Sequence, residues 1–147
     1  YGSAGEGVAR LDGQAVFVKG ALAGELCQVQ LLKVGKSAAW GRVAEVTEPS
    51  PGRQAPDCPQ YPKCGGCQLQ AMSYEEQLKF KERKVMNNLV RIGKFAEDEI
   101  HMLPIMGMEE PWRYRNKAQF PLEVDSKGNL NIGFYKKYAM LVSMTFC

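Results

Sequence analysis

The stretch GEGVARLDGQAVFV at residues 5–18 decides the fold of this chain. Two short runs of β-prone residues flank Asp12-Gly13, a dipeptide that is well suited to the tight turn of a β-hairpin. Leu26–Val34 and residues 39–46 have the same character, and glycines stand between the runs. Short strands at close intervals predict a small closed or nearly closed β-barrel, because closure removes exposed strand edges.

Four segments of this barrel carry a resemblance to a known family. They are GEGVAR at 5–10, VFV at 16–18, ALAGE at 21–25 and EPSPGR at 48–53. Together they resemble a TRAM domain, a small OB-like RNA-binding β-barrel that is attached to several RNA-modifying enzymes. Five cations of this unit are candidates for contacts with RNA phosphates: Arg10, Lys19, Lys33, Lys36 and Arg42. Arg10 and Lys33 are the preferred candidates. The alternative for each is an ordinary solvated side chain.

A proline-rich stretch after residue 50 leads into a group of three cysteines, Cys58, Cys64 and Cys67, and Cys147 supplies a distant fourth thiol. Five cysteines in total cannot all pair in intramolecular disulfides, and their clustering is typical of metal binding in a reducing compartment, so we expect a cytoplasmic location. Four thiolates suit either tetrahedral zinc or an iron–sulfur cluster. Three grouped ligands favour the cluster, because zinc modules usually show two close pairs. Unligated or disulfide-forming thiols remain a further alternative.

The spacing Cys-x5-Cys-Gly-Gly-Cys-x-Leu-Gln at residues 58–70 closely resembles that of the RNA (uracil-5-) methyltransferases, which modify uridine in rRNA or tRNA. The resemblance implies a 4Fe–4S cluster bound by Cys58, Cys64, Cys67 and Cys147. Because four cysteines would ligate the cluster fully, no iron would be open to substrate, and we expect a structural role. The resemblance also implies methyl transfer from S-adenosylmethionine to uracil carbon 5.

One long helix is predicted over residues 73–93. Ser73 and Glu76 form a capping-box pattern, good helix formers follow, and Gly93 is a natural stop. An apolar stripe on this helix is expected to be a packing surface rather than a binding site, and its members are Leu78, Val85, Leu89 and Ile92. The resemblance implies that this stripe packs against the methyltransferase domain, so within this chain it is expected to lack its partner. The basic residues on its other faces are expected to be a solvated surface, with RNA binding as the alternative.

The stretch WRYRNKAQFP at residues 112–121 mixes aromatic and cationic side chains, which can stack on unpaired bases and hold phosphates. It also matches the Tyr-Arg-Asn-Lys pattern of the methyltransferases, and the preferred RNA contacts are Arg113, Arg115 and Lys117. The alternative is a strand in which Tyr114 and Phe120 fill the core. Residues 115–146 are expected to form an antiparallel hairpin or meander.

Composition bounds the remaining choices. The chain has 147 residues, 45% of them apolar and 24% charged, as in soluble globular proteins, and no apolar run approaches the roughly 18 residues of a membrane span, so no membrane partner is expected. Its formal charge of +3 permits nucleic-acid binding without demanding it.

No catalytic or cofactor-binding residue is expected within the chain, because no strand is followed by a glycine-rich turn that would hold S-adenosylmethionine. The expected fold class is mainly β with α, with a TRAM barrel at residues 1–50 and a partial α+β iron–sulfur region at 51–147. Since the chain opens at Tyr1 rather than Met, we expect an N-terminal fragment that is inactive alone. The Rossmann-like methyltransferase domain is then expected beyond Cys147.

The expected partners are structured RNA, either rRNA or tRNA, and the missing methyltransferase domain, and the full-length protein is expected to be a monomer. The alternative function is a stand-alone zinc or iron–sulfur RNA-binding module without catalytic activity.

Overall fold

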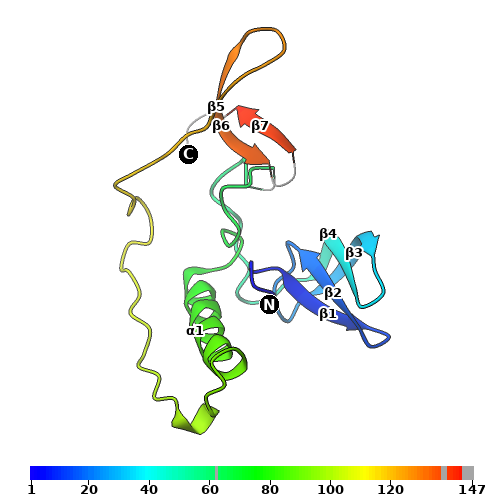
Figure 1. The fold of residues 1–147 in the computed structure, drawn as a ribbon, viewed down its shortest axis with the longest axis vertical. Coiled ribbons are helices and arrows are strands. Elements are labelled where there is room, and N and C mark those ends of the chain that lie inside the picture. Colours follow the sequence, from blue (N-terminus) through cyan, green and yellow to red (C-terminus); the bar gives the residue numbers. More distant parts are fainter. Residues whose placement is uncertain (62, 137–138, 144–147) are drawn as a thin grey trace. The chain divides into compact units, whose positions relative to one another are not determined.

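The computed structural model describes residues 1–61, 63–136 and 139–143. Most of its elements are strands, with one α-helix and one short 3-10 helix (Figure 1). In chain order the elements are β1 (Gly7–Leu11), β2 (Gln14–Lys19), β3 (Leu26–Val34), β4 (Ala38–Glu48), α1 (Tyr74–Arg91), η1 (Glu97–Glu99), β5 (Leu122–Val124), β6 (Leu130–Lys136) and β7 (Ala139–Ser143). The predicted class, mainly β with α, is confirmed. In the part of the chain that the structure describes, no helix has the length and apolar character to cross a membrane.

Two compact units divide the chain. The first contains Tyr1–Gln54 and Ala71–Gly107, and the second contains Ala55–Gln70 and Met108–Cys147. Helix α1 therefore groups with the first four strands rather than with the cysteines. The boundary at residue 50 between a TRAM barrel and an iron–sulfur region stays a prediction.

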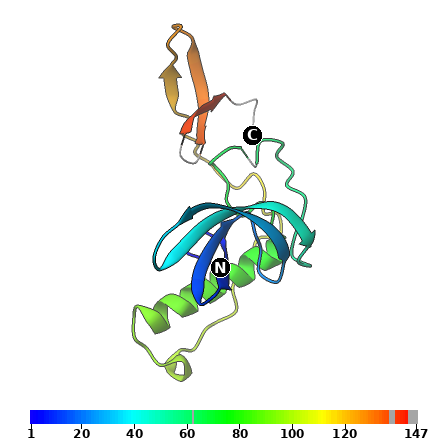
Figure 2. The same cartoon turned by 90° about the vertical axis from the view of Figure 1, so that its right-hand side faces the viewer.

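The first unit contains a four-stranded sheet with the order β1-β2-β4-β3. Strands β1 and β2 form the predicted antiparallel hairpin, and Asp12 and Gly13 both have the positive φ that its tight turn requires. Strand β2 pairs in parallel with β4, and β4 pairs antiparallel with β3. The strands are strongly curved, as expected for a barrel-like domain (Figure 2).

The core of this unit lies on one face of the sheet. Val16 and Val18 of β2 and Ala39 of β4 are buried there together with Ala21, and Cys27 packs against them partly buried. Burial, and then the negative charge of Glu25, raise the pKa of the Cys27 thiol. Because side chains alternate between faces along a strand, the residues between these buried positions lie on the opposite face.

A carboxylate without solvent exposure joins the loop after β2 to the segment that follows β4. Glu25 contacts Nε of Arg53, accepts a second hydrogen bond from the same guanidinium at 2.7 Å, and accepts from the backbone N–H groups of Leu22 at 2.7 Å and Ser50 at 3.3 Å. Burial alone would raise the pKa of Glu25, but these donors outweigh it and hold the pKa below its ordinary value. We call Glu25 and Arg53 the carboxylate latch.

Helix α1 begins as predicted, with Ser73 as its N-cap. The Ser73 hydroxyl accepts a hydrogen bond from the backbone N–H of Glu76 at 3.3 Å. The carboxylate of Glu76 accepts from Arg83 at 2.9 Å instead of closing the capping box on Ser73. The backbone N–H of Ser73 donates to the carbonyl of Gly52 at 2.8 Å, so half of the predicted box forms.

The helix ends near Gly93, but for a different reason from the one predicted. The left-handed residue after the helix is Lys94, with φ 61°, whereas a Cβ on Gly93 would lie 2.6 Å from the carbonyl oxygen of Leu89 and 2.9 Å from the ring of Phe95. Glycine is needed at this position because the chain folds back closely on the last turn.

The predicted apolar stripe of α1 is only partly covered in this structure, and Leu78 and Leu89 are half-buried. Val85 and Ile92 are 50% and 76% exposed, whereas the buried side chain of the helix is Phe80. Phe80 meets Tyr1 edge to face, with 5.3 Å between ring centroids. This aromatic contact between the chain start and the helix selects a different helix face for burial than the sequence periodicity did.

The second unit contains the sheet β5-β6-β7, in which neighbouring strands are antiparallel. The turn between β5 and β6 is held by Asp125, whose carboxylate accepts from the backbone N–H groups of Lys127 and Asn129, both at 2.9 Å. These strands form the meander that was predicted within residues 115–146.

Candidate nucleic-acid interface and cysteine loop

Two aromatic side chains lie together on the sheet face opposite the core. Phe17 of β2 and Trp40 of β4 are in register, and their rings are stacked with 6.1 Å between centroids and 18° between planes. Trp40 is 43% exposed. Val8 of β1 and Lys33 of β3 complete the same row across all four strands. The sheet thus presents an exposed stacking surface at its centre.

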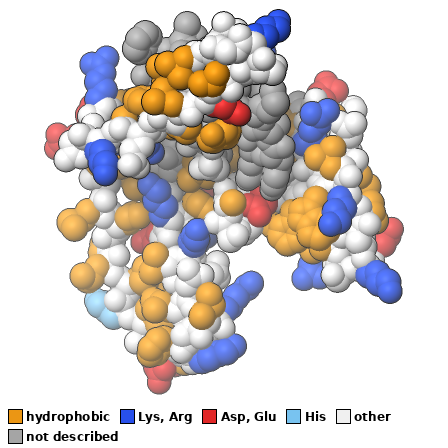
Figure 3. All heavy atoms as spheres, turned by 45° about the horizontal axis from the view of Figure 1, so that its top comes forward, with side chains coloured by type: hydrophobic (Ala, Val, Ile, Leu, Met, Phe, Trp, Pro, Cys, Tyr) orange, Lys and Arg blue, Asp and Glu red, His pale blue; other side chains and the backbone are white. Residues whose placement is uncertain are grey.

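Cations surround this aromatic pair. The Nζ of Lys33 lies 5.5 Å from the centre of the Trp40 ring, within the range of a cation–π contact. Arg42 follows Trp40 by two residues on the same face, and its Nε donates to Gln30 at 2.8 Å. The right-hand part of Figure 3 shows hydrophobic side chains beside Lys and Arg side chains over this sheet.

The remaining cations of this surface lie one row to either side. Lys19 is paired in register with Arg42, and Arg10 of β1 is paired with Ala15, two residues before Phe17. We call the surface formed by Arg10, Phe17, Lys19, Lys33, Trp40 and Arg42 the aromatic–cation face. Exposed rings flanked by cations can stack on unpaired bases while the cations hold the phosphates, as in proteins that bind single-stranded nucleic acid.

The structure brings four of the predicted cations onto this one face, and they are Arg10, Lys19, Lys33 and Arg42. The fifth, Lys36, lies in the turn between β3 and β4. Sequence reasoning missed Phe17 and Trp40. A signal for Phe17 was present, because it stands between Val16 and Val18, and strict alternation places it on the opposite face from these two core residues. Pairing it with Trp40 needs the parallel β2–β4 register, which the sequence did not reveal.

The predicted contacts at residues 112–121 lie outside regular secondary structure. Arg113 has φ 56°, Arg115 lies 5.9 Å from the ring of its neighbour Tyr114, and Lys117 is exposed. Tyr114 and Phe120 are 61% and 49% exposed, so the alternative of a strand with both rings in the core is wrong. The stretch presents mixed cations and rings to solvent.

Cys58, Cys64 and Cys67 lie in one loop of the second unit, and all three are free thiols. Local hydrogen bonds shape the loop: the backbone N–H of Cys64 donates to Gln60 O at 2.8 Å, and that of Cys58 donates to the side chain of Gln70 at 3.4 Å. The loop is anchored to β6 by a hydrogen bond from Gly65 N to Tyr135 O at 3.1 Å. We call residues 58–67 the cysteine loop.

The three thiols share one electrostatic environment. Burial raises the pKa of Cys67, the negative charges of Cys64 and Cys58 raise it further, and the nearby Arg115 opposes them. The backbone N–H of Gly66 also donates to the sulfur of Cys64 at 3.3 Å, a kind of contact that tunes thiolate ligands of iron–sulfur clusters.

The three thiols are the type of ligand that binds zinc or an iron–sulfur cluster. Among the described residues, however, no group of three or more His, Cys, Asp or Glu side chains is arranged to hold a metal ion. The fourth predicted ligand, Cys147, lies outside the described residues. The metal centre and its identity therefore stay a prediction.

Comparison with known proteins shows similarity to the TRAM domain family and to RNA methyltransferases. Residues 1–44 match the TRAM domain family. Over 134 residues the chain is 46% identical to a protein of Clostridium tetani named as an uncharacterized RNA methyltransferase, and the match covers 91% of the chain and 28% of that protein. A relative of the same description from Halalkalibacterium halodurans is 44% identical over 144 residues, with 97% of the chain and 31% of the relative covered.

A third relative, from Bacillus cereus, is 45% identical over 133 residues and has the same description, and 90% of the chain and 28% of the relative are covered. The predicted resemblance to a TRAM domain and to RNA methyltransferases is confirmed. The chain spans less than a third of the length of these curated relatives.

Proposed function

We propose that this chain, which matches the TRAM family and is similar to RNA methyltransferases, is the RNA-recognition and 4Fe–4S-binding part of an S-adenosylmethionine-dependent RNA (uracil-5-) methyltransferase. Its substrate is uridine in rRNA or tRNA. The observation that carries the proposal is the aromatic–cation face, because it lies within the residues that match the TRAM domain.

The face recognises an unpaired segment of the substrate RNA. Trp40 and Phe17 give a stack for successive bases, and base–aromatic stacking contributes about 1–3 kcal/mol for each base. Lys33 and Arg42 are held beside the rings by a cation–π contact and a side-chain hydrogen bond, so their charges are placed before RNA binds. A prearranged surface loses less entropy on binding.

Cys58, Cys64 and Cys67 of the cysteine loop and the distant Cys147 would hold the cluster. When bound, such a cluster supplies iron–thiolate bonds that close a long loop of chain, and this stabilises the fold. Three residues around the thiols support the loop in different ways. Gly66 donates its N–H to Cys64, Gly65 anchors the loop to β6, and Arg115 offsets the negative charge of the thiolates.

The methyl transfer itself is assigned to other parts of a longer protein. Binding of the methyl donor and attack of a thiolate on carbon 6 of uracil need a glycine-rich cofactor turn and a nucleophilic cysteine, and no residue of this chain is given either role. Taken alone, the chain is inactive and binds RNA.

The test uses the full-length protein, purified without oxygen. Iron and acid-labile sulfide are measured, and unmodified rRNA and tRNA transcripts are incubated with S-adenosylmethionine and analysed for 5-methyluridine. We expect about four irons and four sulfides for each chain and 5-methyluridine in one of the RNAs. One zinc per chain would overturn the cluster assignment. RNA binding without any methyl transfer would favour the stand-alone RNA-binding module, and methylation of another base position would overturn uracil-5 specificity.

A further inference from the structure

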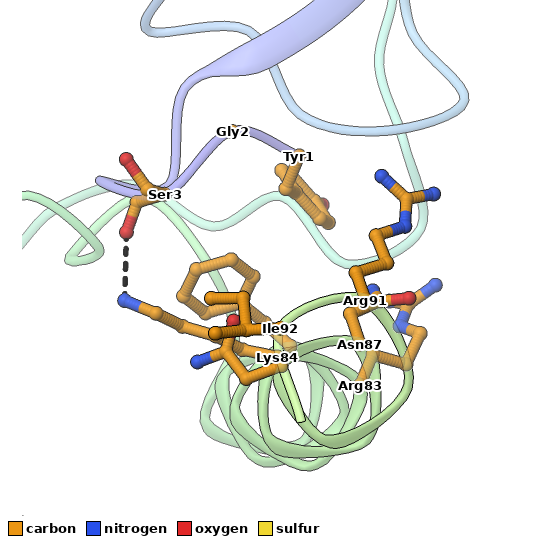
Figure 4. Close-up of a pocket in the computed structure, with 10 residues that line it drawn as sticks. Tyr1, Gly2, Ser3, Arg83, Lys84, Asn87, Arg91 and Ile92 are labelled. Atoms are coloured by element: carbon orange, nitrogen blue, oxygen red, sulfur yellow. Dashed lines mark hydrogen bonds between the residues drawn. The ribbon is translucent and has the colours of Figure 1, made fainter. Parts of the chain in front are cut away.

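A second basic surface lies in the first unit, on helix α1. Residues 1–3 pass over the helix and leave an open groove of about 280 Å³ beside it. Figure 4 shows Lys84 reaching from one side of α1 toward Ser3, with Arg83 and Arg91 on the other side. This helix face was predicted to be a solvated surface, with RNA binding as the alternative, and the aromatic–cation face does not include it.

The groove is polar and positively charged. Ten of the described residues line the groove; three of them are cations, and none carries a carboxylate. The ring of Tyr1 lies 5.8 Å from the Arg83 guanidinium and packs edge to face on Phe80. The groove therefore has an aromatic wall as well as cations.

Helical spacing aligns the donors. Arg83, Asn87 and Arg91 recur every four residues, which puts them in one row along the helix, and Lys84 with Asn88 forms a parallel row. Two rows of cations and amides separated by full turns match a ligand with repeated acceptors better than a single compact ion. A nucleic-acid backbone has this repeated acceptor pattern.

Much of the positive charge in the groove is not neutralised. Lys84 donates to the carbonyl of Ser3 at 2.7 Å, which is an uncharged acceptor, and Arg91 makes no ion pair with any of the described residues. Only Arg83 has a carboxylate partner, Glu76 at 2.9 Å. Two cations are thus available to an anionic ligand without breaking an ion pair.

We infer that this groove is a second RNA contact, in which Lys84 and Arg91 bind phosphates of a single-stranded segment. The inference rests on the proposed function, because the choice of RNA over another polyanion comes from it. The groove is open, and its volume is slightly below the roughly 300–1,000 Å³ of pockets that enclose small molecules. It suits a backbone passing along the helix better than an enclosed cofactor.

The experiment measures binding of a 12-nucleotide oligouridylate to the full-length protein at several salt concentrations. The test variant is Lys84→Gln with Arg91→Gln, and the control is Lys81→Gln, which removes a charge from an exposed position of the same helix outside the groove. We expect roughly tenfold weaker binding for the double variant, since charged hydrogen bonds to phosphate are lost. The slope of log K against log salt should fall by about 1.4, because a single-stranded phosphate contact contributes about 0.7.

The outcomes separate the groove from the proposed function. The wild-type protein can bind the oligouridylate while the double variant has the same affinity and salt slope as Lys81→Gln. That result overturns the assignment of the groove as an RNA contact and leaves the proposed function standing. Wild-type protein that binds the rRNA or tRNA transcripts but not the oligouridylate also overturns the assignment of the groove. Wild-type protein that binds none of these RNAs overturns both proposals. Because Lys84 also contacts Ser3, RNA binding by Arg91→Gln is measured alone as well, and the melting temperatures of all variants are compared with that of the wild type. A loss of affinity that appears only in variants with a lowered melting temperature also overturns the assignment of the groove as an RNA contact.

Discussion

At the scale of single residues, Glu25 connects segments of the first unit that lie far apart in the sequence. Its carboxylate accepts from Arg53 and from two backbone N–H groups and has no solvent exposure, and Arg53 in turn donates to the carbonyl of Gly20 at 2.7 Å. The carboxylate latch therefore fixes the turn before β3 to the segment after β4. A buried charge of this kind is tolerated only because every acceptor site has a donor.

Replacing Glu25 by Gln should destabilise the protein by about 2–4 kcal/mol at pH 7, because the Arg53 charge loses its partner and buried donors lose theirs. Chemical denaturation of both proteins measures this difference. Glu45→Gln on β4, an exposed position, is the control and should cost less than about 0.5 kcal/mol. Equal losses in the two variants would contradict the role of the latch.

The stability difference between wild type and Glu25→Gln should depend on pH. The pKa of Glu25 is lower in the folded protein than its ordinary value near 4.5, so protonation favours unfolding. The stability that the carboxylate contributes is complete above the ordinary value and disappears as pH falls through the lower folded value. The difference in unfolding free energy between wild type and Glu25→Gln should therefore shrink between pH 5 and pH 3. A difference that stays constant over this range would argue against a depressed pKa.

At the scale of elements, β2 and β4 contribute to both the hydrophobic core and the aromatic–cation face. Val16, Val18 and Ala39 build the core on one face, while Phe17 and Trp40 stack on the other. The parallel register between the two strands sets both arrangements at once, so a shift of one residue would bury the aromatic pair and expose the core.

Replacing Trp40 by Ala should weaken RNA binding by the full-length protein by about 1–3 kcal/mol, the contribution of one base stacked on an aromatic ring. The salt dependence should stay nearly the same, since no phosphate contact is removed directly. Leu32→Ala, an exposed apolar position on neighbouring β3, is the matched control and should bind as wild type does. If both variants bind equally well, the aromatic–cation face is not the RNA surface.

Replacing Arg113 and Arg115 by Gln tests the second predicted contact segment. Here we expect weaker binding together with a smaller salt slope, because charges rather than rings are removed. The contrast with Trp40→Ala is informative, since the two variants should affect the salt slope differently. Unchanged affinity and slope would leave both arginines as ordinary surface residues.

The end of α1 gives a prediction about folding alone. Gly93→Ala would place a Cβ 2.6 Å from the carbonyl oxygen of Leu89, and the chain must shift to relieve this contact. We expect a loss of about 1–3 kcal/mol in unfolding free energy, comparable with overpacking. The comparison is Gly24→Ala, where a Cβ meets no atom within 4 Å and φ is 81°, so only the backbone strain of about 1–2 kcal/mol applies. A loss in Gly93→Ala smaller than in Gly24→Ala would contradict the steric account.

At the scale of the whole molecule, the chain is built as two units whose segments interleave in sequence. The cysteine loop belongs to the unit that contains β5, β6 and β7, and the aromatic–cation face belongs to the unit that contains α1. A metal bound by the thiols would therefore act directly on the unit that contains β5, β6 and β7.

Removal of the metal should act unequally on the two units. After chelation under reducing conditions, we expect faster amide hydrogen exchange in β5 and β6 and in residues 58–67, with little change in β2 and β4. The aromatic–cation face should keep most of its RNA affinity. Uniform loss of protection in all strands would show that the metal holds the entire fold, and no change anywhere would mean that the thiols are not structural ligands.

Much of this architecture could be predicted because its signals are local. Asp12-Gly13 determined the first hairpin, Ser73 fixed the start of α1, and the turn at Asp125 defined the β5–β6 hairpin. In each case the decisive interaction joins residues close together in the chain. Reasoning from propensity and capping therefore reached the correct element without knowing its partners.

The remaining features depend on contacts between residues far apart in the sequence. Burial of Phe80 instead of Val85 and Ile92 requires the ring of Tyr1, and stacking of Trp40 on Phe17 requires the β2–β4 pairing. Sequence by itself determined the strands, the helix and the set of thiols, because these follow from residue type and local spacing. Only the tertiary structure decided which face of each element is buried and which cations share a surface with the aromatic rings, because such choices depend on long-range packing that no local pattern records.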